Sequence, residues 1–242
     1  MSKIALISDI HANLTALESV LADAVKQGAE RYVCLGDVVG YGPNPSECVT
    51  AIQELGCICI KGNHDEYISY GDELNNFNEL AKAALTWTKG QLSTPQKDWL
   101  ASLPYTRRLG RQMLVHASIN NPESWEYVRN SFDASIALNA QNTDMCFSGH
   151  THVPVVYEMS GGKVKSIDEE VVQLDATSKY LVNCGSVGQP RDGDPRACYV
   201  MFDTIERTIT FRRIPYDAES VAAEIRAAGL PEKLAARLIE AY

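Results

Sequence analysis

Polar residues of the types that bind divalent metal ions follow five strand-like apolar runs in this chain. They are Asp9 and His11, Gly36 and Asp37, residues 62–65 (Gly-Asn-His-Asp), His116, and His150 and His152. All five histidines of the chain lie in these groups. Because the carboxyl ends of parallel strands meet at one edge of an α/β sheet, we expect the five groups to converge on one crevice.

The residue types in these groups predict metal chemistry. Asp9 and His11 are two residues apart, so both can face one ion where the chain turns. Asp37 has two carboxylate oxygens that can bridge two ions, Asn63 offers an amide oxygen, and the remaining histidines offer imidazole nitrogens. Such mixed sets suit Mn, Fe, Zn or Ni better than Ca or thiolate-bound Zn. Two ions about 3.5–4 Å apart can hold a phosphoryl group and activate a water molecule.

Composition limits the classes of protein that fit this chain. It has 242 residues, 45% of them hydrophobic, and a net charge of −9 at pH 7. The acidic balance argues against binding to bulk nucleic acid or to a membrane surface. A metal site could still attract a phosphorylated small molecule, with nucleotides among the candidates. The sequence does not indicate an oligomeric state.

Targeting and redox signals are also informative. No run approaches the ~18 uncharged apolar residues of a membrane span, and the first residues do not resemble a signal peptide, so we expect a cytoplasmic protein. The seven cysteines are scattered and form no Cys-x-x-Cys pair. We therefore expect reduced thiols in the core.

The order of the elements predicts the fold class. Buried strands are expected at residues 4–8, 31–35 and 57–60, with helices at 14–28 and 46–55, which is typical of an α/β protein with a parallel sheet. Thr15 and Glu18 have the spacing of a capping box. Residues 66–104 read as helices inserted as a cap. A hairpin at 107–116, a strand at 145–147, β-structure over 153–214 and helices at 218–228 and 231–242 complete the chain.

The order of the motifs, Asp-x-His, Gly-Asp, Gly-Asn-His-Asp, His and Gly-His-Thr-His, resembles the calcineurin-like metallophosphoesterase superfamily. Residues 40–45 and 185–196 resemble its small bacterial and archaeal phosphodiesterase-type branch. The resemblance covers residues 3–215. It implies a four-layer αββα sandwich, here formed by one domain over residues 1–242 with the helical cap at about 66–104.

The resemblance also implies two divalent metal ions per chain, with Mn as the first choice and Fe, Zn, Ni or Mg as alternatives. Matched position by position, each ion has three ligands of its own and shares Asp37 as the bridge. The sets are Asp9, His11 and His152 for the first ion, and Asn63, His116 and His150 for the second. His64 matches the general acid that protonates the leaving oxygen, and Asp65 would orient His64.

The implied reaction is hydrolysis of phosphodiesters, and also of phosphomonoesters, by in-line attack of a hydroxide that bridges the ions. Alternatives within the superfamily are a dinucleoside polyphosphate hydrolase and a phosphoprotein phosphatase. A nuclease fits the acidic chain poorly. An alternative from another class is a metal-bound protein-binding module of the same fold, against which the presence of His64 argues.

Several residues keep two interpretations. Asp65 either orients His64 or caps the following helix. Tyr41 belongs either to a simple turn or to the substrate-binding rim of the cleft, and Arg191 is either a surface charge or a phosphate-binding group. Trp87 and Trp99 form the core of the cap or a stacking platform for a base.

Overall fold

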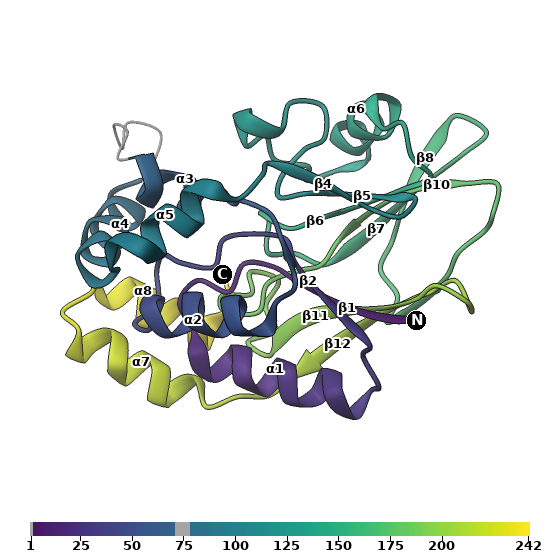
Figure 1. Cartoon of the computed structure of the whole chain (residues 1–242). Coiled ribbons are helices and arrows are strands. Elements are labelled where there is room, and N and C mark those ends of the chain that lie inside the picture. Colours follow the sequence, from purple (N-terminus) through teal and green to yellow (C-terminus); the bar gives the residue numbers. More distant parts are fainter. Residues whose placement is uncertain (1, 71–77) are drawn as a thin grey trace.

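Two six-stranded sheets lie face to face in the computed structural model, which describes residues 2–70 and 78–242 (Figure 1). The first sheet has the order β3 (Ile58–Cys59), β2 (Arg31–Cys34), β1 (Lys3–Ile7), β11 (Ala197–Asp203), β12 (Thr208–Ile214), β9 (Val171–Gln173). The second has the order β4 (Thr106–Leu109), β5 (Gln112–Val115), β6 (Met145–Ser148), β10 (Lys179–Asn183), β7 (Val155–Ser160), β8 (Lys163–Ile167). Strands β3, β2 and β1 are parallel, as are β5, β6 and β10.

Helices cover the outer faces of both sheets. On the side of the first sheet lie α1 (Leu14–Lys26), α2 (Pro45–Leu55), α7 (Ala218–Ala227) and α8 (Glu232–Glu240). The helix α6 (Ser131–Ala140) packs on β7, β8 and β10 of the second sheet. Three more helices, α3 (Asn63–Tyr70), α4 (Glu79–Gln91) and α5 (Thr94–Ser102), form a group at one end of the sandwich (Figure 1).

Successive side chains of a strand point to opposite faces of the sheet, and this alternation explains how the layers pack. In β1, Ile4 and Leu6 join the core between the two sheets, whereas Ala5 and Ile7 join the core beneath α1 and α2. A strand whose two faces are both buried must be apolar at every position, and β1 satisfies this after its first residue. The four-layer αββα sandwich of the α/β class that the sequence predicts is therefore confirmed.

Most predicted elements are present, with small shifts at their ends. The first helix begins after Asn13, whose side chain accepts a hydrogen bond from the Ala16 N–H at 3.1 Å, so the predicted capping box of Thr15 and Glu18 is wrong. Asparagine caps the N-terminus of a helix as well as threonine does, or better. Helix α6 was not predicted, because its apolar residues do not follow a single face of the helix.

The predicted cap region contains α4, α5 and most of α3, while residues 71–77 of it lie outside the described residues. Trp87 packs against the cluster formed with α7 and α8, and Trp99 packs against the cluster beneath α1 and α2. These contacts favour the core interpretation of both tryptophans. The description of this region as an inserted cap remains a prediction.

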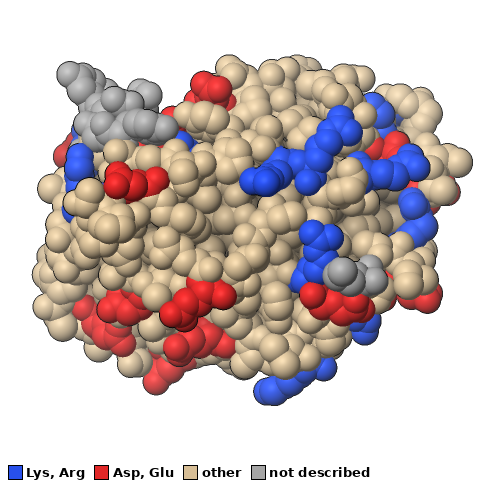
Figure 2. Space-filling model, in the orientation of Figure 1, with Lys and Arg blue, Asp and Glu red and all other residues tan. Residues whose placement is uncertain are grey.

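Surface charge is unevenly distributed. On the face shown in Figure 2, acidic side chains gather over the helices of the first sheet and basic side chains over the β4–β5 edge of the second. Arg111 in the β4–β5 turn pairs with Asp144 at 2.7 Å. Arg111 precedes β5, whereas the predicted metal ligand His116 follows it. Arg111 therefore lies at the opposite end of this strand from the predicted metal ligands.

Two further predictions concern the cysteines and the membrane. All seven cysteines are free and six of them are buried, which agrees with core thiols. Among the described helices, none combines the length and the apolar character needed to cross a bilayer.

The inter-sheet core gives a stability prediction. Phe147 is fully buried there, with its ring centroid 5.4 Å from that of Phe202. Phe147→Ala should lower the free energy of unfolding by about 3–5 kcal/mol, because it removes buried area and leaves a cavity. Phe132→Ala, the same change at a residue that is 73% exposed, is the matched control. Equal urea midpoints for the two variants would contradict this account of the core.

Candidate metal centre

The ends of five strands and the loops after them bring the predicted ligands together. Asp9 follows β1, Asp37 follows β2, and Asn63 begins α3 after β3. From the second sheet, His116 follows β5 and His150 follows β6. The crevice therefore lies between the two sheets, at the carboxyl ends of their parallel strands.

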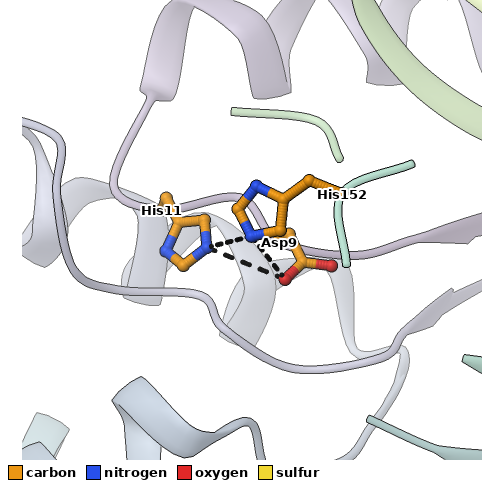
Figure 3. Close-up of side chains that lie close together, drawn as sticks. All are labelled: Asp9, His11 and His152. Carbon is orange, nitrogen blue, oxygen red and sulfur yellow. Dashed lines mark hydrogen bonds and ion pairs between the residues drawn. The ribbon is translucent and has the colours of Figure 1, made fainter. Parts of the chain in front are cut away.

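Asp9, His11 and His152 form one group of possible ligands (Figure 3). The Nε2 atoms of His11 and His152 are 3.1 Å apart, and His152 Nε2 lies 3.2 Å from Asp9 Oδ1. The distance from His11 Nε2 to the same oxygen is 3.7 Å. All three residues are buried. One small cation could contact all three groups.

Asp37, His116 and His150 form a second group. Asp37 Oδ2 lies 3.4 Å from His116 Nε2 and 3.6 Å from His11 Nε2, so this carboxylate stands between the two groups. Within each group the possible ligand atoms lie within 4.8 Å of one another. Asn63 lines the same pocket as Asp37 and His150. The structure thus brings all seven predicted ligands to one crevice, with Asp37 between the two groups.

Hydrogen bonds on the outer side of the rings fix which nitrogen faces the site. In three histidines, Nδ1 faces a backbone carbonyl, and a carbonyl can only accept, so the proton is on Nδ1 and Nε2 points inward. The pairs are His11 with Val39, His116 with Leu35 and His152 with Gln189, at 3.2, 2.8 and 2.5 Å. His150 is reversed, since its Nε2 donates to the Trp125 carbonyl at 3.0 Å and leaves Nδ1 for the site.

Three buried polar atoms at the site test whether a metal fits. Asp9 Oδ1, Asn63 Oδ1 and His116 Nε2 are buried and make no hydrogen bond. Buried polar atoms without partners are costly and rare. A carboxylate oxygen, an amide oxygen and an imidazole nitrogen are suitable ligands for a divalent transition metal ion. The residues present therefore fit the predicted metal ions.

Burial and neighbouring charges shift the pKa values of the histidines in the site. Burial lowers the pKa of His150 to about 3 and that of His152 to about 4. Burial also acts to lower the pKa of His116, but the charges of Asp37 and Asp9 outweigh it and raise the value to about 10. In the metal-free protein, protonated His116 therefore balances part of the negative charge of Asp37 and Asp9, which a bound metal ion would balance instead.

The backbone around the site is strained. Eight of the ten non-glycine residues with positive φ in the described parts of the chain lie there, namely Asp9, His11, Ala12, Asp37, Tyr41, Trp125, His150 and His152. Such conformations cost free energy and persist only where other contacts impose them. At Asp9, Asp37 and His150, these backbone conformations turn the side chain toward the crevice immediately after the strand.

Asp65 supplies one such contact. Its carboxylate accepts hydrogen bonds from the backbone N–H groups of Asp37, Val38, Val39 and Gly62, at 2.8–3.3 Å. The sequence suggested that Asp65 orients His64 or caps a helix. The hydrogen bonds tie the loop after β2 to the start of α3, and the bond from Gly62 is one that caps this helix. The role of Asp65 in orienting His64 stays a prediction.

A pocket of about 360 Å³ opens beside the metal groups. His64, Tyr41 and Arg191 line it together with Asn63 and His152. The His64 ring is buried between surrounding rings, with centroids 4.5 Å from Tyr41 and 4.8 Å from His11. Burial lowers the pKa of His64 well below its usual value. These three residues thus line the pocket beside the two groups of possible ligands.

The arginines of the 185–196 stretch separate into two kinds. The Arg191 guanidinium lies over the Tyr41 ring, donates to Gln189 Oε1 at 2.9 Å, and has a buried Nε atom without a hydrogen bond. Arg196 instead forms an exposed ion pair with Asp194. Arg191 therefore belongs to the pocket, and Arg196 belongs to the surface.

Among the residues of the pocket wall that were not predicted from the sequence are two neighbouring aromatic ones. Trp125 and Tyr127 lie between β5 and α6, beside the short 3₁₀ helix η2 (Pro122–Ser124), and both line the pocket. The one available signal was the pair of aromatic residues in a polar segment without helical or strand periodicity.

Comparisons with known proteins agree with this geometry. Residues 2–207 match the model of the calcineurin-like phosphoesterase superfamily domain. An uncharacterised protein of Methanocaldococcus jannaschii is 39% identical over 241 residues, covering 98% of this chain and 97% of that protein. The phosphodiesterase YfcE of Escherichia coli is 29% identical over 213 residues, covering 84% of this chain and 88% of YfcE.

A solved structure is similar over the whole chain. The crystal structure of a metallophosphoesterase from Sphaerobacter thermophilus has 40% sequence identity and a TM-score of 0.88, and the match covers 100% of this chain and 99% of that one.

Close packing around Asp37 gives a prediction on metal binding. A Cβ atom on Gly62 would lie 2.1 Å from Asp37 Oδ1 and 2.3 Å from the Asp37 backbone nitrogen, so Gly62→Ala must displace the carboxylate. We expect Mn²⁺ affinity, measured by calorimetry, to fall by about 10- to 100-fold. Gly90→Ala is the control, because no atom lies within 4 Å of its Cβ position. A folded Gly62→Ala variant with unchanged affinity would contradict the role of Asp37.

The raised pKa of His116 predicts proton release. At pH 8 its imidazole, with a pKa of about 10, is still protonated, and a metal ion must displace that proton. His150 and His152, with pKa values of about 3 and 4, are already neutral and release none. Metal affinity should therefore rise with pH, and calorimetry in buffers of different ionisation enthalpy should detect about one proton released per chain. His116→Gln should lower the release by about one proton per chain, and an unchanged release would contradict the assignment.

Proposed function

This chain belongs to the calcineurin-like phosphoesterase superfamily, and we propose that it is a metal-dependent hydrolase of phosphodiesters, acting also on phosphomonoesters. The observation that carries the proposal is the pair of Asp/His groups that meet at Asp37 beside an open pocket. The name of YfcE, a phosphodiesterase, supports the diester preference.

Two divalent ions would be held by the seven residues described above, with Mn²⁺ as the first choice and Fe, Zn, Ni or Mg as alternatives. When bound, they would activate water and balance the negative charge that develops on the phosphate. The chain itself contributes the carboxylates of Asp9 and Asp37, whose pKa values lie far below the usual range despite burial, because the neighbouring histidines lower them. Both carboxylates are therefore ionised and available as ligands at neutral pH.

His64 would protonate the leaving oxygen. It lines the pocket, and its backbone N–H donates to Asp37 Oδ1 at 2.9 Å, which fixes it beside the metal groups. Burial lowers its pKa, Asp37 opposes this, and His11 and Arg191 lower the value further. The negative charge of a bound phosphate ester opposes the lowering effects, so substrate binding favours the protonated form that a general acid requires.

Arg191 and Tyr41 would hold the substrate phosphate. The guanidinium of Arg191 lies in the pocket, and its buried Nε atom has no hydrogen-bond partner. Arginine suits phosphate oxygens because its planar group can donate two parallel hydrogen bonds. Tyr41 packs against His64 and beneath Arg191, so it keeps the proton donor and the phosphate-binding group on one side of the pocket.

The size of the pocket favours a small substrate. Its 360 Å³ lies in the range of pockets that enclose small molecules. Together with the net charge of −9, this supports a small phosphate ester over bulk nucleic acid. A dinucleoside polyphosphate hydrolase, a phosphoprotein phosphatase and a metal-bound binding module remain the alternatives that the following experiment separates.

The proposal predicts metal-dependent hydrolysis of bis-p-nitrophenyl phosphate. Metal-stripped protein should be inactive and should recover turnover when Mn²⁺ is returned. If two metals bind per chain and the diester is not cleaved, the diesterase proposal is wrong. Activity on a monoester, a dinucleoside polyphosphate or a phosphopeptide would then identify the hydrolase, and inactivity on all of them would favour the binding module.

A variant series tests the role of His64. His64→Ala should reduce turnover of an unactivated alkyl ester by about 100-fold or more, the usual contribution of a general acid. The loss should be much smaller with p-nitrophenyl esters, because p-nitrophenolate is a good leaving group without a proton. Equal losses on both substrates would show that His64 does not act as the proton donor.

A further inference from the structure

We propose that Tyr127 and Arg129 are positioning residues that hold His150 in the orientation needed to bind the second metal ion. The inference rests on the proposed function, because it concerns a ligand of the proposed metal site. It adds a role for residues 125–129, which contain no predicted ligand.

The contacts form a stack on one face of the metal site. The Tyr127 ring lies parallel to the His150 ring, with centroids 4.0 Å apart and an angle of 25° between the planes. The guanidinium carbon of Arg129 lies 3.9 Å from the centroid of Tyr127. Since one face of the tyrosine is occupied by His150, Arg129 must lie over the other face. The stack combines an aromatic pair with a cation–π contact.

A hydrogen bond fixes the remaining freedom of His150. Its Nε2 donates to the carbonyl of Trp125 at 3.0 Å, two residues before Tyr127. Trp125 has a φ of 57°, which is a strained conformation for a large side chain. The stack sets the plane of the imidazole, and the hydrogen bond sets its rotation within that plane. Together they aim Nδ1 at the group formed with Asp37 and His116.

The segment itself is anchored to the fold. Val128, between the two stacking residues, is buried in the cluster beneath α6. The Arg129 backbone N–H donates to Asp133 Oδ2 at 3.0 Å, and the Asn130 side chain caps α6 by accepting from the N–H groups of Phe132 and Asp133. The stack is therefore attached to a helix end rather than to a free loop.

His150 depends on this segment more than the other ligand histidines depend on theirs. His11, His116 and His152 are held by carbonyls of loops that leave the sheets near the site, at Val39, Leu35 and Gln189. His150 is held by the 125–129 segment, and its stacking partner Tyr127 is 41% exposed. Loss of the stack should therefore weaken one metal position and leave the other intact.

The experiment compares Tyr127→Ala, Tyr127→Phe and Arg129→Ala with Phe132→Ala, an exposed aromatic control in the adjoining helix α6. Mn²⁺ titration calorimetry gives the number and affinity of bound ions, and the visible spectrum of the Co²⁺ form reports ligand geometry. Tyr127→Ala should weaken the second ion by about 10- to 100-fold, the usual effect of removing a group that orients a ligand. The first ion should be unaffected. Tyr127→Phe keeps the stack and should restore binding, Arg129→Ala should lose less than Tyr127→Ala, and Phe132→Ala should resemble the original protein.

Other outcomes overturn the inference. Two ions bound by Tyr127→Ala with the original affinities and Co²⁺ spectrum would show that the stack does not position His150. A raised KM with unchanged metal binding would make Tyr127 a substrate contact instead. Equal weakening of both ions with a lower Tm would show a merely structural role. If the original protein itself binds fewer than two ions, the proposed function fails, and this inference fails with it.

Discussion

The central constraint on this structure is the burial of hydrogen-bond acceptors that point at one another. Asp9 and Asp37 are buried carboxylates, and the Nε2 atoms of His11 and His152 are 3.1 Å apart with both protons committed to carbonyls on the far side. Without a cation between them, such groups repel and lose solvation. The sandwich of two sheets is what forces them together, because it directs the ends of parallel strands from both sheets into the same crevice.

Close approach at the strand ends depends on small residues and on strained backbone. A Cβ atom on Gly62 would collide with Asp37, and one on Gly149 would lie 2.3 Å from Asp9 Oδ2. The left-handed conformations at the ligands are in turn held by contacts such as the four N–H groups on Asp65. The site is thus destabilised locally and supported by the surrounding fold, which is common where geometry serves chemistry.

Sequence predicted what depends on residue type and on the order of elements. The convergence of the ligands followed from apolar runs that end in Asp, Asn or His, and the αββα layers followed from the resemblance that the order of these motifs carries. The sequence could not show what depends on backbone atoms, such as the carbonyls that set the tautomers of His11 and His116, or the amides that engage Asp65. It also missed α6 and the residues before it, because Trp125 and Tyr127 lie in a segment whose local pattern carries no periodicity.

The two proposed metal positions are supported in different ways. Asp9 and His11 follow a strand of the first sheet, and His152 follows a strand of the second. Carbonyls in loops that leave these sheets orient the rings of the two histidines. His150 instead depends on residues 125–129, whose members Trp125 and Tyr127 also form a wall of the substrate pocket. A substitution that reshapes this wall for another substrate therefore changes the support of a metal ligand at the same time. On this proposal, the shape of the pocket and metal binding are coupled on this side of the site.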